Sequence, residues 1–152
     1  MPNTENNPRI FLIGANGQVG HAWRDLLTDE QLVGAVDRHA LDIGELDSLA
    51  ARLHEHLQPH LQPHSQPQSQ PQSQQIQPLV IVNAAAYTAV DLAQDHEQQA
   101  YDINALAPGI IADVAASLHI PLIHYSTDYV FDGHGEKAFV ESDEPAPLSV
   151  YG

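Results

Sequence analysis

Four short apolar runs alternate along this chain with stretches of helical periodicity, and this alternation restricts the fold more than any other feature. The runs are too short for helices and are bounded by glycine, proline or polar residues; they cover 9–13, 32–36, 79–83 and 120–125. Helices are expected over 18–27, 45–57 and 96–118. The order βαβαβαβ predicts a doubly wound, parallel α/β sheet with right-handed crossovers and helices on both faces.

Composition limits the classes of protein that this chain can belong to. Its 152 residues suffice for one domain, and 43% of them are apolar. A formal charge of −15 repels phosphate backbones and argues against a nucleic-acid partner. No apolar run approaches the roughly 20 residues of a membrane span. The polar start of the chain lacks an export signal and cysteine is absent, so we expect a cytoplasmic protein without a membrane partner.

A glycine loop, Gly14-Ala15-Asn16-Gly17-Gln18-Val19-Gly20, joins the first apolar run to the first helix. In such a unit the first glycine permits a tight turn, the second lets the backbone approach a pyrophosphate, and the third allows helix to pack on strand. The free N–H groups of the helix N-terminus then hold the phosphates. A chain of charge −15 needs such backbone groups because it has few lysines or arginines to bind an anion. The loop predicts a Rossmann-like NAD(P) site, with Gly14, Asn16, Gly17, Gln18, Val19 and Gly20 as cofactor-binding residues. On this first helix, the apolar face is expected to comprise Val19, Ala22, Trp23, Leu26 and Leu27.

The second apolar run ends at Asp37-Arg38. An acidic residue there accepts hydrogen bonds from the adenosine ribose and indicates NAD, whereas an arginine faces a 2′-phosphate and indicates NADP. The two signals disagree, so NADH and NADPH both stay open, and a surface Asp-Arg pair in a turn is the plainer alternative. Asp42, with its neighbour Ile43, is a candidate to contact adenine or to begin the next helix.

The third apolar run ends in Asn83-Ala84-Ala85-Ala86. Small side chains there let a flat adenosine lie against the sheet edge, while Asn83 holds the loop. Simple crowding against the glycine loop explains the same residues, and both explanations are compatible.

The fourth apolar run leads directly into Ser126-Thr127, and Tyr151 follows beyond a proline-rich loop. A tyrosine can protonate a carbonyl oxygen while hydride arrives at the carbon, but its free pKa of about 10 must first be lowered, by a lysine or by the nicotinamide ring. Thr127 can hydrogen-bond the same oxygen. Taken singly, Tyr151 is a packing tyrosine and Thr127 a cap at the end of a strand.

Residues 58–78 form a low-complexity stretch of Gln, Pro and Ser. Residues 62–73 contain no apolar side chain, so we expect a disordered surface insertion. His54, His56, His60 and His64 cluster around it, but without cysteines or paired carboxylates the sequence predicts no metal site.

Together these segments resemble the dTDP-4-dehydrorhamnose reductase family of the extended short-chain dehydrogenase/reductase superfamily. The matching residues are 14–20, 82–91, 102–104, 124–133 and 147–152. The glycine loop is typical of the whole superfamily, whereas Asn-Ala-Ala-Ala and Ser-Thr-Asp-Tyr-Val-Phe are far more specific.

The resemblance implies hydride transfer from NADPH or NADH to C4 of dTDP-4-dehydro-L-rhamnose. It makes Thr127 and Tyr151 two members of a catalytic Thr/Tyr/Lys set, and adds Asn104 and Tyr151 to the cofactor-binding residues. The family's lysine, four residues after the tyrosine, and its substrate domain lie outside these 152 residues. We therefore expect an N-terminal part, truncated after about four strands and inactive alone. A homodimer and Mg²⁺ are compatible with the full-length family, although this sequence does not support the metal.

Two other functions stay open. One is a non-catalytic dinucleotide-binding protein resembling the regulatory subunit of methionine adenosyltransferase, although such a protein needs neither Thr127 nor Tyr151. The other is an epimerase or dehydratase acting on nucleotide-sugars. Dehydratases usually carry an acidic pair after the threonine, and Asp128-Tyr129 does not supply it.

Overall fold

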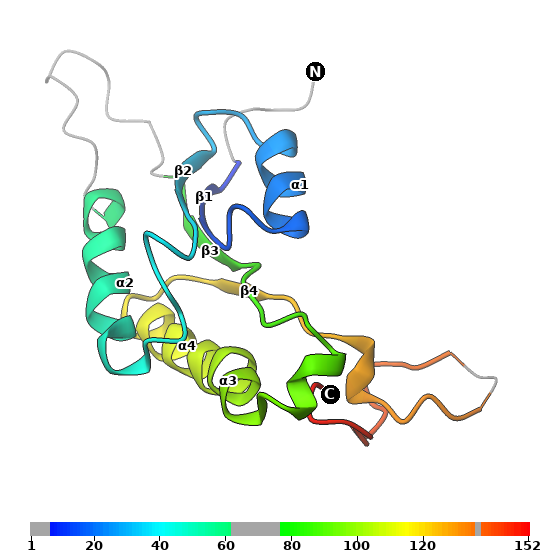
Figure 1. Cartoon of the computed structure of the whole chain (residues 1–152). Coiled ribbons are helices and arrows are strands. Elements are labelled where there is room, and N and C mark those ends of the chain that lie inside the picture. The colour runs from blue at the N-terminus through cyan, green and yellow to red at the C-terminus, as the bar shows by residue number, and fades with distance from the viewer. Residues whose placement is uncertain (1–6, 62–76, 136–137) are drawn as a thin grey trace, which may run out of the picture.

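The computed structural model describes residues 7–61, 77–135 and 138–152, and these residues contain one sheet of four parallel strands (Figure 1). The strands are β1 (Arg9–Ile13), β2 (Leu32–Val36), β3 (Leu79–Asn83) and β4 (Leu122–His124), and they lie in the order β2-β1-β3-β4. Four helices accompany them: α1 (Gln18–Leu26), α2 (Leu46–Leu61), α3 (Glu97–Tyr101) and α4 (Ala107–Ser117). Three shorter segments are the 3₁₀ turns η2 (Asp91–Gln94) and η4 (Asp128–Val130) and the π-turn η3 (Asp102–Leu106).

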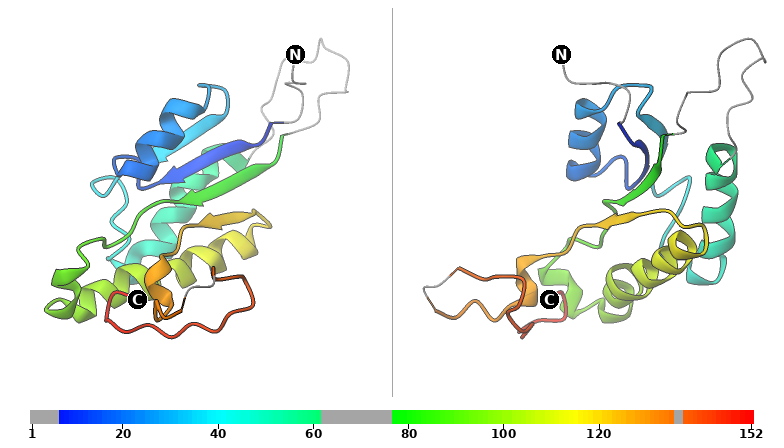
Figure 2. Two further views of the ribbon diagram at one scale, coloured as in Figure 1. Left: turned by 90° about the vertical axis from the view of Figure 1, so that its right-hand side faces the viewer. Right: turned by 180° about the vertical axis from the view of Figure 1, so that it is seen from behind.

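Successive side chains of a strand point to opposite faces of a sheet, and the apolar residues of β1 and β3 therefore feed two separate cores. Phe11 and Ile81 belong to the core formed with α2 and α4, whereas Leu12 and Val82 belong to the core beneath α1. The two views of Figure 2 show α1 on one side of the sheet and α2 and α4 on the other. The predicted α/β sheet with helices on both faces is confirmed.

The strand order explains where a ligand can bind. From β1 the chain passes through α1 to β2 at one edge, and from β2 it returns across β1 to β3. The connections therefore leave β1 and β3 in opposite directions, and open α/β sheets bind ligands at the carboxyl ends of two such strands. Here these ends are Ile13 and Asn83, which are paired in the sheet.

Two predicted elements of the C-terminal half differ in detail. The helix expected over 96–118 runs from 97 to 117, but it contains a π-helical segment, 102–106, two residues before Pro108. Proline has no N–H to donate and its ring crowds the carbonyl four residues earlier, so the helical register widens there. The strand expected over 120–125 is reduced to Leu122–His124, because Ile120 bonds back to Ala115 and Pro121 offers the ladder only its carbonyl.

The first two helices also differ from the prediction. In α1, Trp23 and Leu27 pack against the sheet, but Val19 is 40% and Leu26 is 77% exposed, since they lie on the outer side of the helix. Helix α2 continues to Leu61, so residues 58–61 are helical and do not belong to the predicted insertion. Residues 62–76 and His64 lie outside the described residues. No helix in the part of the chain that the structure describes is long and apolar enough to cross a membrane.

Candidate functional site

The glycine loop turns sharply at Gly14 and presses this residue against the loop after β3. Gly14 has φ +84°, and a Cβ on it would lie 2.5 Å from the Ala85 nitrogen and 2.7 Å from the Ala84 carbonyl carbon. A Cβ on Gly20 would overlap the Gly14 carbonyl oxygen, so α1 can approach this turn only through a glycine. The crowding expected between the glycine loop and the alanine run is therefore present.

Gly17 differs from its two neighbours in the motif, because nothing in the chain requires a glycine there. Its φ of −77° and ψ of 169° suit any residue, and the nearest atom to an added Cβ would be the Gly14 carbonyl oxygen, at 3.5 Å. Gly17 is also the N-cap of α1, where it supplies no side-chain cap. The first N–H groups of a helix have no partner within the helix. Gln18 and Val19 are themselves exposed, so an anion can approach their backbone N–H groups.

Asn83 ties the carboxyl ends of β3 and β4 together. It is the one buried polar residue among those described, at 1% exposure. Its Oδ1 accepts a hydrogen bond from the Ala85 N–H at 3.1 Å, and its Nδ2 lies 3.1 Å from Nδ1 of His124. Burial lowers the pKa of His124 below its usual value, although the Asn83 backbone opposes this. A neutral imidazole accepts at Nδ1, so Asn83 holds the loop as expected and also orients His124.

The resemblance assigns Asn104 to the cofactor site, but both polar atoms of its side chain hydrogen-bond to the backbone of the loop after β3. Its Oδ1 accepts from the Tyr87 N–H at 2.8 Å, and its Nδ2 donates to the Tyr87 carbonyl at 2.9 Å. The Tyr87 hydroxyl lies 3.1 Å from Nδ1 of His96. Asn104 thus fixes the course of the loop that begins with Ala84, Ala85 and Ala86. A contact of its side chain with a cofactor stays a prediction.

Asp37 is held within the loop after β2. Its Oδ1 accepts from the N–H groups of His39 and Ala40, at 3.0 and 3.1 Å, and its Oδ2 accepts from Nδ2 of Asn16 at 2.6 Å. The Ala40 N–H contributes most to lowering the pKa of Asp37 below its usual value. Asn16 therefore connects the glycine loop to the end of β2, and its own Oδ1 lies 3.5 Å from Nη1 of Arg24.

Arg38 pairs with Asp42 and not with its neighbour Asp37. Its Nε lies 3.0 Å from Oδ2 of Asp42, whose Oδ1 accepts from the Gly44 N–H at 2.9 Å. Burial works to raise the pKa of Asp42, but the Gly44 N–H and the Arg38 guanidinium outweigh it, and the pKa is lower than usual. The side chain of Ile43 is buried in the core, so only its backbone can reach a ligand. A cavity of about 420 Å³ opens beside this loop; it is lined by Arg38, Asp42, Gly44, Glu45, Gln98, Gln99, Asp102 and Ile103.

Thr127 and Tyr151 meet the same residue, Tyr129. Oγ1 of Thr127 accepts the Tyr129 N–H at 3.2 Å and so caps η4, and it lies 3.3 Å from Oδ1 of Asp128. The ring of Tyr151 stands edge-on to that of Tyr129, with 5.5 Å between the centroids. The C-terminal segment is held there because the Ala146 N–H bonds to the Val130 carbonyl at 2.8 Å. Folding therefore brings these two candidates, 24 positions apart, to one turn beyond β4.

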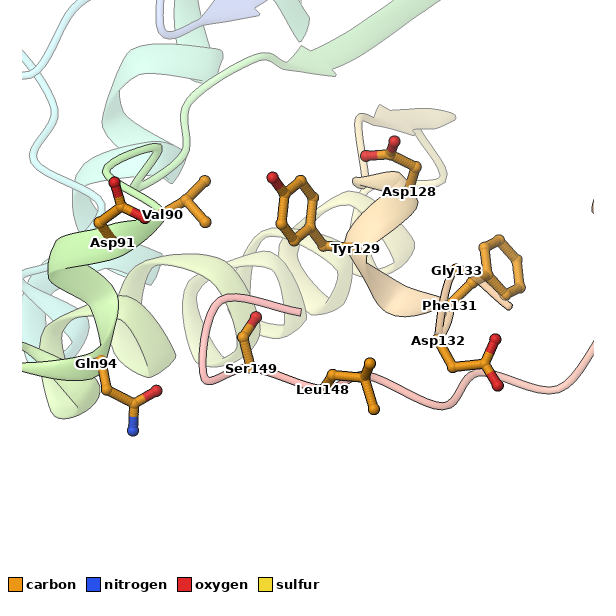
Figure 3. A pocket seen from close by; sticks show the side chains of 10 residues that line it. All are labelled: Val90, Asp91, Gln94, Asp128, Tyr129, Phe131, Asp132, Gly133, Leu148 and Ser149. Atoms are coloured by element: carbon orange, nitrogen blue, oxygen red, sulfur yellow. The ribbon is translucent and has the colours of Figure 1, made fainter. Parts of the chain in front are cut away.

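A cavity of about 650 Å³ lies beside this turn (Figure 3). Tyr129 projects from η4 toward Val90 across it, and Ser149 and Leu148 border it from the C-terminal segment. Asp91, Asp128 and Asp132 supply carboxylates, and Gln94, Phe131 and Gly133 complete the lining. No arginine or lysine is among these residues. Sequence reasoning did not select Tyr129, because its only signal is its place in the Ser-Thr-Asp-Tyr block.

A family model described as the RmlD substrate binding domain matches residues 8–152. The chain belongs to the RmlD family. Two curated members are dTDP-4-dehydrorhamnose reductases: that of Sinorhizobium fredii is 47% identical over 144 residues, and that of Escherichia coli K12 is 37% identical over 143. These matches cover 95% and 94% of this chain but only 42% of each relative.

A solved RmlD-family structure has the same architecture. It is the dTDP-4-dehydrorhamnose reductase of Bacillus anthracis in complex with NADP, with a TM-score of 0.75 and 29% identity over 95% of this chain and 45% of that one. The chain thus spans less than half the length of the RmlD-family proteins it matches. Within residues 7–61, 77–135 and 138–152, no group of three or more His, Cys, Asp or Glu side chains could hold a metal ion.

Proposed function

We propose that this chain is the dinucleotide-binding part of an NAD(P)H-dependent oxidoreductase that reduces the C4 keto group of dTDP-4-dehydro-L-rhamnose. The observation that carries the proposal is Gly17, a glycine that the fold does not need, at an uncapped helix N-terminus beside the ends of β1 and β3. A Cβ there would stand in the space through which an anion reaches the first N–H groups of α1.

The residues present suit a dinucleotide. The N–H groups of Gln18 and Val19 would hold the pyrophosphate, and the loops after β2 and β3 would enclose the adenosine. The 420 Å³ cavity offers carboxylate and amide acceptors for an exocyclic amine such as that of adenine. A bound reduced cofactor would supply the hydride for C4.

Thr127 and Tyr151 would serve the oxygen of the keto group. As hydride adds to C4, the oxygen takes the proton of the Tyr151 hydroxyl and becomes an alcohol, and Thr127 donates a hydrogen bond to the same oxygen. The hydroxyl of Thr127 now faces Asp128 and must turn to do so. The 650 Å³ cavity suits the sugar, since its carboxylates accept from hydroxyl groups and Val90 and Leu148 suit a methyl group. No described cation lines it, so we expect the diphosphate to bind elsewhere.

Titration of NADPH and NADH into the full chain tests the dinucleotide site. We expect at least one of them to bind, and Gly17→Ala to weaken binding about tenfold or more, equivalent to the loss of one charge-assisted hydrogen bond. Gly109→Ala is the matched control, because a Cβ at Gly109 on α4 meets nothing within 4 Å. The proposal is wrong if neither dinucleotide binds to chain that circular dichroism shows to be folded.

A non-catalytic dinucleotide-binding protein is the second candidate. In its favour, Thr127 caps η4 and Tyr151 packs on Tyr129, so both have structural roles. Tyr151→Phe separates the two functions, because it keeps the ring contact and removes only the hydroxyl. In a protein that carries this chain together with the family's lysine and substrate domain, a reductase should lose about 10²-fold or more of its turnover of the keto-sugar nucleotide while NADPH binding is retained. Such a protein that binds NADPH but shows no turnover with Tyr151 intact would favour the non-catalytic function.

A further inference from the structure

One side-chain hydrogen bond joins the helix that follows the glycine loop to the strand that leads to Thr127. Nε1 of Trp23, on α1, donates to the Tyr125 hydroxyl at 2.9 Å, across 102 positions of the chain. Tyr125 directly follows β4 and precedes Ser126-Thr127. The bond therefore connects the two places that a dinucleotide-dependent reductase has to align, the proposed pyrophosphate loop and the proposed Thr127 site.

The backbone holds the end of β4 only weakly. The pairing of β3 with β4 stops at Asn83 and His124. The next bond, from the Tyr125 N–H to the Asn83 carbonyl, is 3.5 Å long, which is beyond the usual range for such bonds. On its other side, β4 has no neighbour within the described sheet. The hydroxyl of Tyr125 therefore makes a shorter and firmer contact than its backbone does.

Trp23 is well placed to fix Tyr125, because its own ring is anchored. The indole packs against the core beneath α1, to which Val82 of β3 belongs. Ile123 pairs with Val82 and points to this face of the sheet, and the bond to Trp23 places Tyr125 on the same face. Ile123 and Tyr125 are 43% and 45% exposed, so packing alone does not hold the end of β4. The hydrogen bond thus sets the position of this strand end relative to α1.

We propose that Trp23 and Tyr125 are positioning residues, whose hydrogen bond fixes the exit of β4, and with it the Thr127 hydroxyl, relative to the N-terminus of α1. The inference rests on the proposed function and adds two residues that act on its reaction through Thr127. Only Ser126 lies between Tyr125 and Thr127, so a shift of the strand end also moves the hydroxyl that would bond the keto oxygen. A misplacement of about 1 Å in such a group can cost about 10²-fold in rate.

Tyr125→Phe tests the contact in the 152-residue chain, because it removes only the acceptor. Trp23 is the only tryptophan, so we expect its fluorescence emission to change in this variant. Hydrogen exchange of the backbone amides at position 125 and at Tyr129, which bonds to Thr127, should accelerate about fivefold, the equivalent of one neutral hydrogen bond. Tyr101→Phe is the matched control, since this hydroxyl belongs to a 56% exposed side chain and has no hydrogen bond among the described residues. Unchanged exchange, or equal acceleration in β1, would overturn the local role.

Turnover is measured in a protein that carries this chain together with the family's lysine and substrate domain. There Tyr125→Phe and Trp23→Phe should each lower kcat about tenfold, while KM and the affinity for NADPH stay within about twofold. The double variant should lose no more than either single one, since both changes remove the same bond. Additive losses, or an unchanged kcat, would overturn the proposal and leave the dinucleotide site standing. Failure of the wild type to bind NADPH would instead reject the proposed function, and hydrogen exchange would still decide whether the two residues position Thr127.

Discussion

At the scale of single residues, the three glycines of one loop have three different physical roles. Gly14 is required by its positive φ and by the backbone of Ala84 and Ala85, and Gly20 by the carbonyl of Gly14. Gly17 is required by neither, which is why it points to a ligand. If the proposed dinucleotide site is right, the motif combines two constraints on folding with one on binding.

Gly14→Ala tests the first of these roles. The left-handed backbone alone should cost about 1–2 kcal/mol in the free energy of unfolding, and the overlap with the loop after β3 should add to it. Denaturant titration of Gly14→Ala and Gly17→Ala measures the difference. We expect Gly17→Ala to cost no more than about 1 kcal/mol, because alanine is a poorer N-cap than glycine but neither φ nor the neighbouring backbone excludes a Cβ there. Equal destabilisation by both changes would contradict the separation of roles.

His124 makes the junction of β3 and β4 sensitive to pH. Its pKa is lowered in the folded chain, so the unfolded chain binds more protons below about pH 6.5, the ordinary value for histidine. The contribution of His124 to stability is therefore complete above that pH and is lost as the pH falls through the folded pKa. Denaturant titrations between about pH 7.5 and 5 should show a decline that is smaller in His124→Gln, which does not titrate. Identical pH profiles for the two proteins would show that this histidine is not coupled to folding.

At the scale of elements, the π-turn and the loop after β3 form one unit. The π-turn 102–106 contains Asn104, and two hydrogen bonds from its side chain replace the ladder that the chain lacks once β3 has ended. Loops that carry a site usually depend on such side-chain contacts, since their backbone groups have no regular partners.

Asn104→Ala should therefore loosen this loop. Because it leaves the Tyr87 N–H and carbonyl unpaired in a half-buried place, we expect a loss of about 1–3 kcal/mol in the free energy of unfolding. Hydrogen exchange of the Tyr87 amide should accelerate by more than the change in global stability accounts for. Gln98→Ala is the control, because it removes an exposed bond to Asp102 and should cost little. An unchanged Tyr87 amide would mean that the loop is held by other contacts.

At the scale of the whole molecule, the sheet has an uncovered corner. Helix α1 covers β1 and β3 on one face of the sheet. Ile123 of the edge strand β4 pairs with Val82 and so points to this same face, but it is 43% exposed. Unpaired edge strands with apolar side chains promote association, whereas a charge of −15 opposes it.

We therefore expect the 152-residue chain to associate increasingly as salt screens its charge. Ile123→Lys should reduce this association, since an inward-pointing charge on an edge strand disfavours edge-to-edge pairing. Leu26→Lys removes a more exposed apolar side chain from α1 and should have less effect. Light scattering after size-exclusion chromatography measures the mass at each salt concentration. A monomer at all salt concentrations, or equal effects of both variants, would show that β4 is not the contact.

The order of strands and helices, the glycine loop and the polar residues at the ends of β2, β3 and β4 could all be predicted from the amino-acid sequence. These features depend on the periodicity of neighbouring residues and on the conformations that glycine and proline allow, which are local properties of the chain. The same local reasoning did not predict the π-helical segment before Pro108, and it misjudged the length of β4 and the continuation of α2, because such details depend on what packs around each element.

Which side chains meet could not be predicted from the sequence and depends on the folded chain. Asn16 joins Asp37 across 21 positions, Asn104 joins Tyr87 across 17, and Nε1 of Trp23 donates to the Tyr125 hydroxyl across 102. Each contact requires two loops or helices to be positioned by separate strands before either side chain has a partner. The same holds for Arg52 of α2, which donates to the Ala40 carbonyl in the loop after β2.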